Sequence, residues 1–191
     1  MGLLSKKNKP SQKAYAVVTG AGSGIGRSFA LELAKRGGDV ICADIELSSA
    51  QETVDLIQSM TSTSAYAVHC DVGLKESVHA LAEQAEQLLG HPVTLLINNA
   101  GVGLGGKFDE VSLEDWQWCM HVNLWGVIHG CHYFVPKFKQ QGFGAIINVA
   151  SAAGYTAAPE MTAYNVTKSS VLALSETLAS ELHAYNIAVN V

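Results

Sequence analysis

A tyrosine and a lysine near the end of the chain have a spacing that could support acid–base chemistry. Tyr164 and Lys168 are four positions apart in a segment with helical periodicity, so the two side chains are predicted to share one helix face. A lysine ammonium beside a tyrosine favours the phenolate form, which can take a proton from an alcohol at neutral pH. The same spacing is also common on ordinary amphipathic helices. Its meaning therefore depends on what lies beside it.

A glycine-rich turn near the start of the chain points to a nucleotide. The run Thr19–Gly26 (T-G-A-G-S-G-I-G) joins an apolar segment to a helical pattern, and Asp44 ends the next apolar segment. Glycines let the backbone approach a pyrophosphate at a helix N-terminus, and a carboxylate at that later position can accept hydrogen bonds from adenosine ribose hydroxyls. A purely structural turn is the alternative. The βαβ context favours dinucleotide binding, with contacts expected from Gly20, Ser23, Gly24, Ile25, Gly26 and Asp44.

The elements that must position these residues follow a strict alternation. Short apolar runs, each predicted to be a strand, alternate with helical patterns, and Ser112 is the expected N-cap of a long helix. Such alternation predicts an α/β fold, a Rossmann-like doubly wound parallel sheet with helices on both faces. We expect one domain over residues 13–191 after a flexible basic tail over residues 1–12. The predicted strands are 14–19, 40–44, 65–70, 94–98, 145–150 and 187–191.

The spacing T-G-x-x-x-G-x-G resembles the fingerprint of the classical short-chain dehydrogenase/reductase family, and further motifs extend the resemblance along the chain. Asp71 and Val72 resemble the family's adenine-contacting pair, and Asn98–Gly101 (N-N-A-G) resembles its motif after the fourth strand. The resemblance adds the following expected cofactor contacts: Asp71, Val72, Asn99, Ala100, Gly101, Tyr164 and Lys168.

The same resemblance implies a catalytic set of Asn123, Ser151, Tyr164 and Lys168. Tyr164 would be the general acid/base, and Lys168 would also hold the nicotinamide ribose. Ser151, expected at the end of the fifth strand, would orient the substrate oxygen, and Asn123 would anchor a water that relays protons to Lys168. The implied activity is interconversion of a secondary alcohol and a ketone by hydride transfer.

The expected cofactor is NAD rather than NADP. Asp44 would repel a 2′-phosphate, and neither Ser23 nor Ile45 supplies the positive charge that such a phosphate requires. Two other functions stay open. One is a catalytically idle nucleotide-sensing module, against which the intact serine, tyrosine and lysine count. The other is a different chemistry of the superfamily, such as epimerisation or dehydration, against which the glycine spacing counts.

Composition limits the partners. The net charge of −5 argues against nucleic acid, and no apolar stretch is long enough for a membrane span, so a cytoplasmic protein with a small-molecule substrate is expected. The four cysteines show no C-x-x-C spacing, and Cys42 and Cys70 fit buried reduced thiols. The cysteines and histidines of the long helix are not expected to bind metal. The resemblance implies a homo-oligomer, with a symmetric contact to which Trp116, Trp118 and Trp125 could contribute.

The chain ends at Val191, inside the sixth predicted strand. The resemblance implies that a Pro-Gly turn, a helical substrate lid and a seventh strand follow. We therefore expect residues 1–191 to be a truncated enzyme that keeps much of its dinucleotide affinity and has lost catalytic efficiency.

Overall fold

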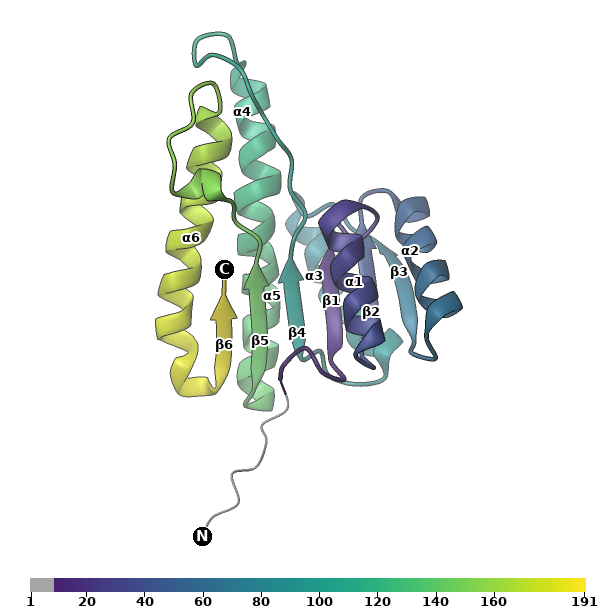
Figure 1. Ribbon diagram of the computed structural model, residues 1–191. Helices are drawn as coiled ribbons and strands as arrows, with labels where there is room; N and C mark the ends of the chain where they lie inside the picture. Colours follow the sequence, from purple (N-terminus) through teal and green to yellow (C-terminus); the bar gives the residue numbers. More distant parts are fainter. Residues whose placement is uncertain (1–8) are drawn as a thin grey trace.

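The computed structural model describes residues 9–191 and has one six-stranded parallel sheet, in the order β3-β2-β1-β4-β5-β6 (Figure 1). The chain starts in the middle of the sheet, builds outward to β3, returns to β4 beside β1 and then builds toward β6. Because the order reverses between β1 and β4, a crevice opens there at the carboxyl ends of the strands. The strands are β1 (Tyr15–Thr19), β2 (Asp39–Asp44), β3 (Ala65–His69), β4 (Leu95–Asn98), β5 (Gly144–Asn148) and β6 (Ile187–Asn190).

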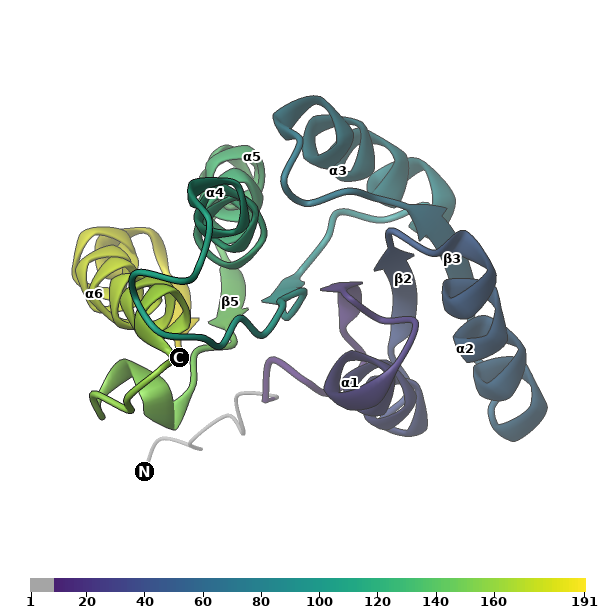
Figure 2. The ribbon, with the colours of Figure 1, turned by 90° about the horizontal axis from the view of Figure 1, so that it is seen from above.

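Helices cover both faces of the sheet, as the view from above shows (Figure 2). One face carries α1 (Gly24–Lys35) and α2 (Leu47–Met60). The other carries α3 (Lys75–Leu89), the long helix formed by α4 (Leu113–Met120) and α5 (Gly126–Gln141), and α6 (Thr162–Leu182). This arrangement confirms the predicted doubly wound fold, and the predicted strand positions agree with the observed ones to within two residues.

Each face of the sheet has its own apolar core. Under α1 and α2, the buried side chains include Val18, Ile97 and Ile57. Under α3, α5 and α6 the core is larger and includes Phe134 and Phe138, both fully buried. The strands alternate between the two cores, as expected for a parallel sheet with both faces covered.

The long helix begins where the sequence predicts. The hydroxyl of Ser112 accepts a hydrogen bond from the Asp115 backbone N–H at 3.0 Å, which satisfies one free donor of the first turn. The helix is not uniform, however: one wider, π-helical turn, η1 (His121–Trp125), lies between α4 and α5. Turns of this kind often mark functional sites. Asn123 lies in this turn.

The predicted tail over residues 1–12 falls outside the described residues for its first eight positions. Residues 9–12 form a turn closed by a hydrogen bond from Gln12 N–H to the Lys9 carbonyl. Over residues 9–191, no helix combines the length and apolar character that crossing a membrane requires.

Candidate functional site

The glycine-rich turn after β1 is fastened to the loop after β4. The hydroxyl of Thr19 accepts hydrogen bonds from the backbone N–H groups of Asn99 at 3.0 Å and Ala100 at 3.1 Å. In return, the Asn99 side-chain amide donates to the Thr19 carbonyl at 2.9 Å. These bonds fix the floor of the crevice between the two strands.

Two glycines of this turn occupy positions that no other residue fits. Gly20 has a φ of 64°, and a Cβ on it would lie 2.9 Å from the Ala100 Cα. A Cβ on Gly26 would overlap the Gly20 carbonyl oxygen and the Asn99 amide. The turn, the first helical turn of α1 and the loop after β4 are therefore packed backbone to backbone.

Two adjoining hollows open above this floor, and together they hold nearly all the residues expected in the site. The first, of about 530 Å³, extends from the glycine-rich turn to the catalytic candidates; the second, of about 330 Å³, extends from the same turn toward β2 and β3. Both are lined by Gly20, Ser23, Ala100, Gly101 and Val102. Only the first contains Gly24, Ile25, Gly26, Asn99, Ser151, Tyr164 and Lys168, and only the second contains Asp44, Asp71 and Val72.

Both carboxylates of the second hollow are held by backbone N–H groups. Asp44 Oδ2 accepts from Gly22 N–H at 2.7 Å, and Asp44 Oδ1 accepts from Glu46 N–H at 3.0 Å. Asp71 Oδ1 accepts from Gly73 N–H at 2.9 Å. Carboxylates fixed in this way keep further lone pairs free for a ligand's hydroxyl or amino groups.

Tyr164 and Lys168 share one face of α6, as their spacing predicts, with the Lys168 Nζ 5.7 Å from the centre of the Tyr164 ring. The Lys168 side chain is buried with 4% exposure, and its ammonium donates to the Val149 carbonyl at 2.8 Å. Burial lowers the pKa of Lys168, because desolvation disfavours the ammonium. The lysine is thus fixed in place behind the tyrosine.

The structure corrects the expected position of Ser151. Strand β5 ends at Asn148, so Ser151 lies beyond the strand and not at its end. Just after the strand, the Val149 N–H still donates to the Asn98 carbonyl of β4 at 2.9 Å, whereas the Val149 carbonyl accepts from Lys168. Ser151 is the N-cap of a short turn, η2 (Ala152–Gly154), and accepts from Ala153 N–H at 3.2 Å. Its hydroxyl proton remains free to be donated into the first hollow.

The side chain of Asn123 lies behind the hollows and is fully buried. Its amide accepts from Val102 N–H at 2.7 Å and donates to the Val102 carbonyl at 2.8 Å, so it acts as a clamp on the loop after β4. It also lies 3.3 Å from the hydroxyl of Thr167, the residue just before Lys168. The π-helical turn thereby joins the loop after β4 to α6.

The three tryptophans of the long helix lie in two different places on the surface. Trp118 lines the second hollow, near Asp71 and Val72, and is 47% exposed. Trp116 and Trp125 line a separate surface hollow with Leu113 and Met120. Sequence reasoning missed the place of Trp118, because the direction of a side chain on a helix depends on the neighbouring elements.

All four cysteines are buried and unpaired with one another. In residues 9–191 no group of three or more histidine, cysteine or acidic side chains is arranged to hold a metal ion. The histidines of the long helix have other contacts: His129 Nδ1 lies 2.9 Å from the Val72 carbonyl, and His132 packs edge-on against Tyr133.

Comparison with known proteins agrees with this geometry. The family model of the short chain dehydrogenases matches residues 14–191. The chain is 38% identical over 184 residues to a cyclohexanol dehydrogenase of Acinetobacter sp. strain SE19, covering 96% of this chain and 72% of that protein. The match covers nearly all the described residues.

Two solved structures have the same fold. One is a short-chain dehydrogenase/reductase from Burkholderia phymatum in complex with NAD, with a TM-score of 0.90 and 38% identity over 94% of this chain and 64% of that one. The other is an NAD⁺-bound xylitol dehydrogenase, with a TM-score of 0.90 and 30% identity over 95% of this chain and 70% of that one. The chain therefore spans about two thirds of these proteins.

A sheet of this order, a glycine-rich turn at its switch point and a match over residues 14–191 define the class of protein. This chain belongs to the short-chain dehydrogenase/reductase family, a family of oxidoreductases built on a Rossmann-like domain.

Proposed function

We propose that this protein is an NAD-dependent oxidoreductase that interconverts a secondary alcohol and a ketone. The observation that carries the proposal is the lining of the first hollow, where Ser151, Tyr164 and Lys168 lie together with the glycine-rich turn. A cofactor seated on the turn and a substrate held by Ser151 and Tyr164 would meet in that space.

The residues present fit a nicotinamide dinucleotide. Gly20 and Gly26 leave no room for side chains, and the turn that they form lines the first hollow and leads into the N-terminus of α1, where backbone N–H groups can bind a phosphate. Asp44 and Asp71 lie on the adenosine side, and Lys168 lies on the other. Solved relatives with the same fold hold NAD, which supports the same cofactor here.

A dinucleotide held by the glycine-rich turn and Lys168 would supply the hydride donor for the carbonyl carbon, or the hydride acceptor for the alcohol carbon. The chain's own residues handle the oxygen. Ser151 donates a hydrogen bond that orients it and stabilises developing negative charge. Tyr164 gives the oxygen a proton in reduction and removes one in oxidation. Lys168, fixed by Val149, lies beside the Tyr164 ring and would bind ribose hydroxyls.

Asn123 has a positioning role in this proposal. Its amide holds Val102, which lines both hollows, and its neighbour Thr167 precedes Lys168. We propose that the π-helical turn around Asn123 also anchors a water that relays protons to Lys168. The side-chain amide is already bonded within the protein, so the backbone of the turn would have to bind that water.

NAD is proposed over NADP because a 2′-phosphate at Asp44 would place two negative charges together in the second hollow. A like-charge contact of this kind costs several kcal/mol when it is desolvated.

The test is a panel of secondary alcohols and ketones, each assayed with NAD(H) and with NADP(H). We expect turnover with at least one pair and a higher kcat/KM with NAD(H). Binding of NADH without turnover of any member would favour a nucleotide-sensing module instead.

A further inference from the structure

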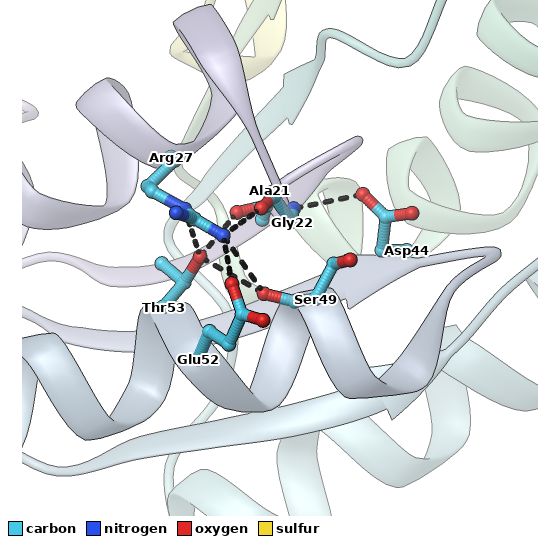
Figure 3. A network of polar contacts seen from close by, with 7 residues as sticks. All are labelled: Ala21, Gly22, Arg27, Asp44, Ser49, Glu52 and Thr53. Atoms are coloured by element: carbon cyan, nitrogen blue, oxygen red, sulfur yellow. Dashed lines mark hydrogen bonds and ion pairs between the residues drawn. The ribbon is translucent and has the colours of Figure 1, made fainter.

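One oxygen of the Asp44 carboxylate is held by a single peptide unit of the glycine-rich turn, and the other accepts from Glu46 N–H at 3.0 Å. That unit joins Ala21 to Gly22, and its N–H donates to Asp44 Oδ2 at 2.7 Å (Figure 3). The Gly22 N–H and the Ala21 carbonyl are two ends of one rigid plane and point in opposite directions. Whatever holds the carbonyl therefore also sets the direction of the N–H.

Thr53 of α2 holds the carbonyl end of this peptide. Its hydroxyl, on a fully buried side chain, donates to the Ala21 carbonyl at 2.8 Å. A second acceptor, the Ser49 carbonyl, lies farther away at 3.3 Å. Since a hydroxyl has only one proton, the shorter contact is the one we assign to it.

Arg27 of α1 determines how Thr53 uses that proton. The Arg27 Nε–H can only donate, and it does so to the Thr53 oxygen at 3.0 Å, so that the Thr53 proton is left for a carbonyl. The Arg27 Nη2 also donates to the Gly22 carbonyl, which holds the following peptide of the turn. A series of hydrogen bonds thus runs from Arg27 through Thr53 and the Ala21–Gly22 peptide to Asp44 (Figure 3).

There is little free space around this peptide. A Cβ on Gly22 would lie 2.7 Å from the Ser49 Cβ and 2.8 Å from Asp44 Oδ2. The turn, α2 and the end of β2 therefore touch at this point. A change in the tilt of the peptide would be passed directly to the Asp44 carboxylate.

We propose that Arg27 and Thr53 are positioning residues that set the preference for an adenosine ribose 2′-hydroxyl over a 2′-phosphate, by fixing the peptide that orients Asp44. The inference rests on the proposed function. Neither residue touches the ligand in this account, and neither lines the second hollow. When the peptide is released, Asp44 keeps only the bond from Glu46 N–H, so its carboxylate can rotate, which weakens its bonds to the hydroxyl and lessens its repulsion of the phosphate.

The experiment measures the dissociation constants of ADP-ribose and of 2′-phospho-ADP-ribose by calorimetry, which needs neither substrate nor turnover. The wild type is expected to bind ADP-ribose more tightly. Arg27→Met and Thr53→Val keep side-chain volume and remove the donors. Each should lower the ratio of the dissociation constant of 2′-phospho-ADP-ribose to that of ADP-ribose by about tenfold, a change that equals the contribution of one charge-assisted hydrogen bond. Thr53→Ser, which keeps the hydroxyl, should restore the wild-type ratio.

Arg36→Met is the matched control. Arg36 is at the end of the same helix and binds Glu32 at 2.8 Å, away from the turn, just as Arg27 binds Glu52 at 2.9 Å. Its loss should leave the ratio unchanged. An equal fall in this control, or a fall in affinity for both ligands that keeps the ratio constant in Thr53→Val, would overturn the inference, since either result means a general loss of structure. If Arg27→Met does not fold, the comparison of Thr53→Val with Thr53→Ser tests the inference alone.

The wild-type measurement separates the two proposals. A wild type without preference for ADP-ribose contradicts the proposed NAD specificity, and the inference about Arg27 and Thr53 falls with it. If the wild type prefers ADP-ribose and the variants keep the same preference, the proposed function stands and only the inference about Arg27 and Thr53 is overturned.

Discussion

Lys168 shows how one residue can depend on the whole site. A 4% exposed ammonium loses most of its hydration, and its one direct protein acceptor in the described residues is the Val149 carbonyl. Burial lowers its pKa, yet the side chain lies beside Tyr164 and the open hollow. Buried cations usually persist where they have a partner or a function. The hollow has space for further acceptors, which in our proposal are the ribose hydroxyls of the dinucleotide.

At the residue scale we predict that Tyr164→Phe lowers kcat by at least about a hundredfold, because general acid–base catalysis contributes roughly 10²–10⁴-fold. The ring remains, so calorimetry should find the affinity for ADP-ribose unchanged. Tyr185→Phe is the control: Tyr185 lies under Lys139, at 4.3 Å from its Nζ, and has no contact with the site. A Tyr164→Phe enzyme with near-normal turnover would remove Tyr164 from the role of acid/base.

At the scale of elements, a buried polar network joins β4, β5 and α6 beneath the site. The Asn98 amide donates to Asn148 Oδ1 at 2.8 Å, and the Asn148 amide donates to the Ser175 hydroxyl at 2.9 Å. Ser175 in turn donates to the Val171 carbonyl at 2.7 Å. Each buried amide therefore has a partner, and α6 is held in a fixed place on the sheet.

We predict that Ser175→Ala lowers the free energy of unfolding by about 1–3 kcal/mol, because it leaves a buried Asn148 donor without a partner. Ser170→Ala on the same helix is the matched control. Ser170 is only partly buried, and its hydroxyl donates to the Val166 carbonyl of its own helix, so its loss should change stability by no more than about 0.5 kcal/mol. Urea unfolding of both variants measures the difference. Equal effects would mean that the network adds nothing to stability.

The order of strands and helices, and the crevice at the carboxyl ends of the strands, could be predicted from the sequence. Apolar runs of strand length between helical patterns predict the sheet, because a parallel strand buried on both faces is mostly apolar. The glycine spacing and the position of Asp44 at the end of β2 identified the crevice for similar reasons. Gly20 and Gly26 are required by the backbone itself, so their pattern in the sequence is direct evidence of the turn.

The remaining features depend on contacts between elements far apart in the chain. Arg27 and Thr53 are 26 positions apart and meet only because α1 and α2 pack side by side. The bond from the Lys168 ammonium to the Val149 carbonyl, just after β5, joins two elements that are separate in the sequence. The clamp that Asn123 makes on Val102 depends on a π-helical turn for which the sequence gives no clear signal.

At the scale of the whole molecule, the two cores contain thiols that ionise only with difficulty. Burial raises the pKa of Cys42 to about 12 and those of Cys70 and Cys131 to about 11, against an ordinary value of 9.0. Unfolding exposes these thiols to water and returns them toward the ordinary value. Their contribution to stability is therefore complete below about pH 9 and is lost as the pH rises toward 11 or 12.

We predict that the free energy of unfolding falls between about pH 8 and about pH 10.5. Cys42→Ala, which lacks the thiol with the most raised pKa, should show a smaller fall over the same range. Urea unfolding at the two pH values measures both. Equal falls in the wild type and the variant would mean that Cys42 ionises as readily in the folded protein as in the unfolded chain.

The central claim is that this protein transfers hydride between an alcohol carbon and a nicotinamide ring. The most direct test uses a secondary alcohol that turns over in the panel, deuterated at the carbon that bears the hydroxyl. NADH formed by the protein is then isolated, and its molecular mass is measured by mass spectrometry. We expect to find the deuterium in the NADH. NADH without the label would contradict the proposed hydride transfer. The absence of NADH formation with every secondary alcohol of the panel would contradict it as well.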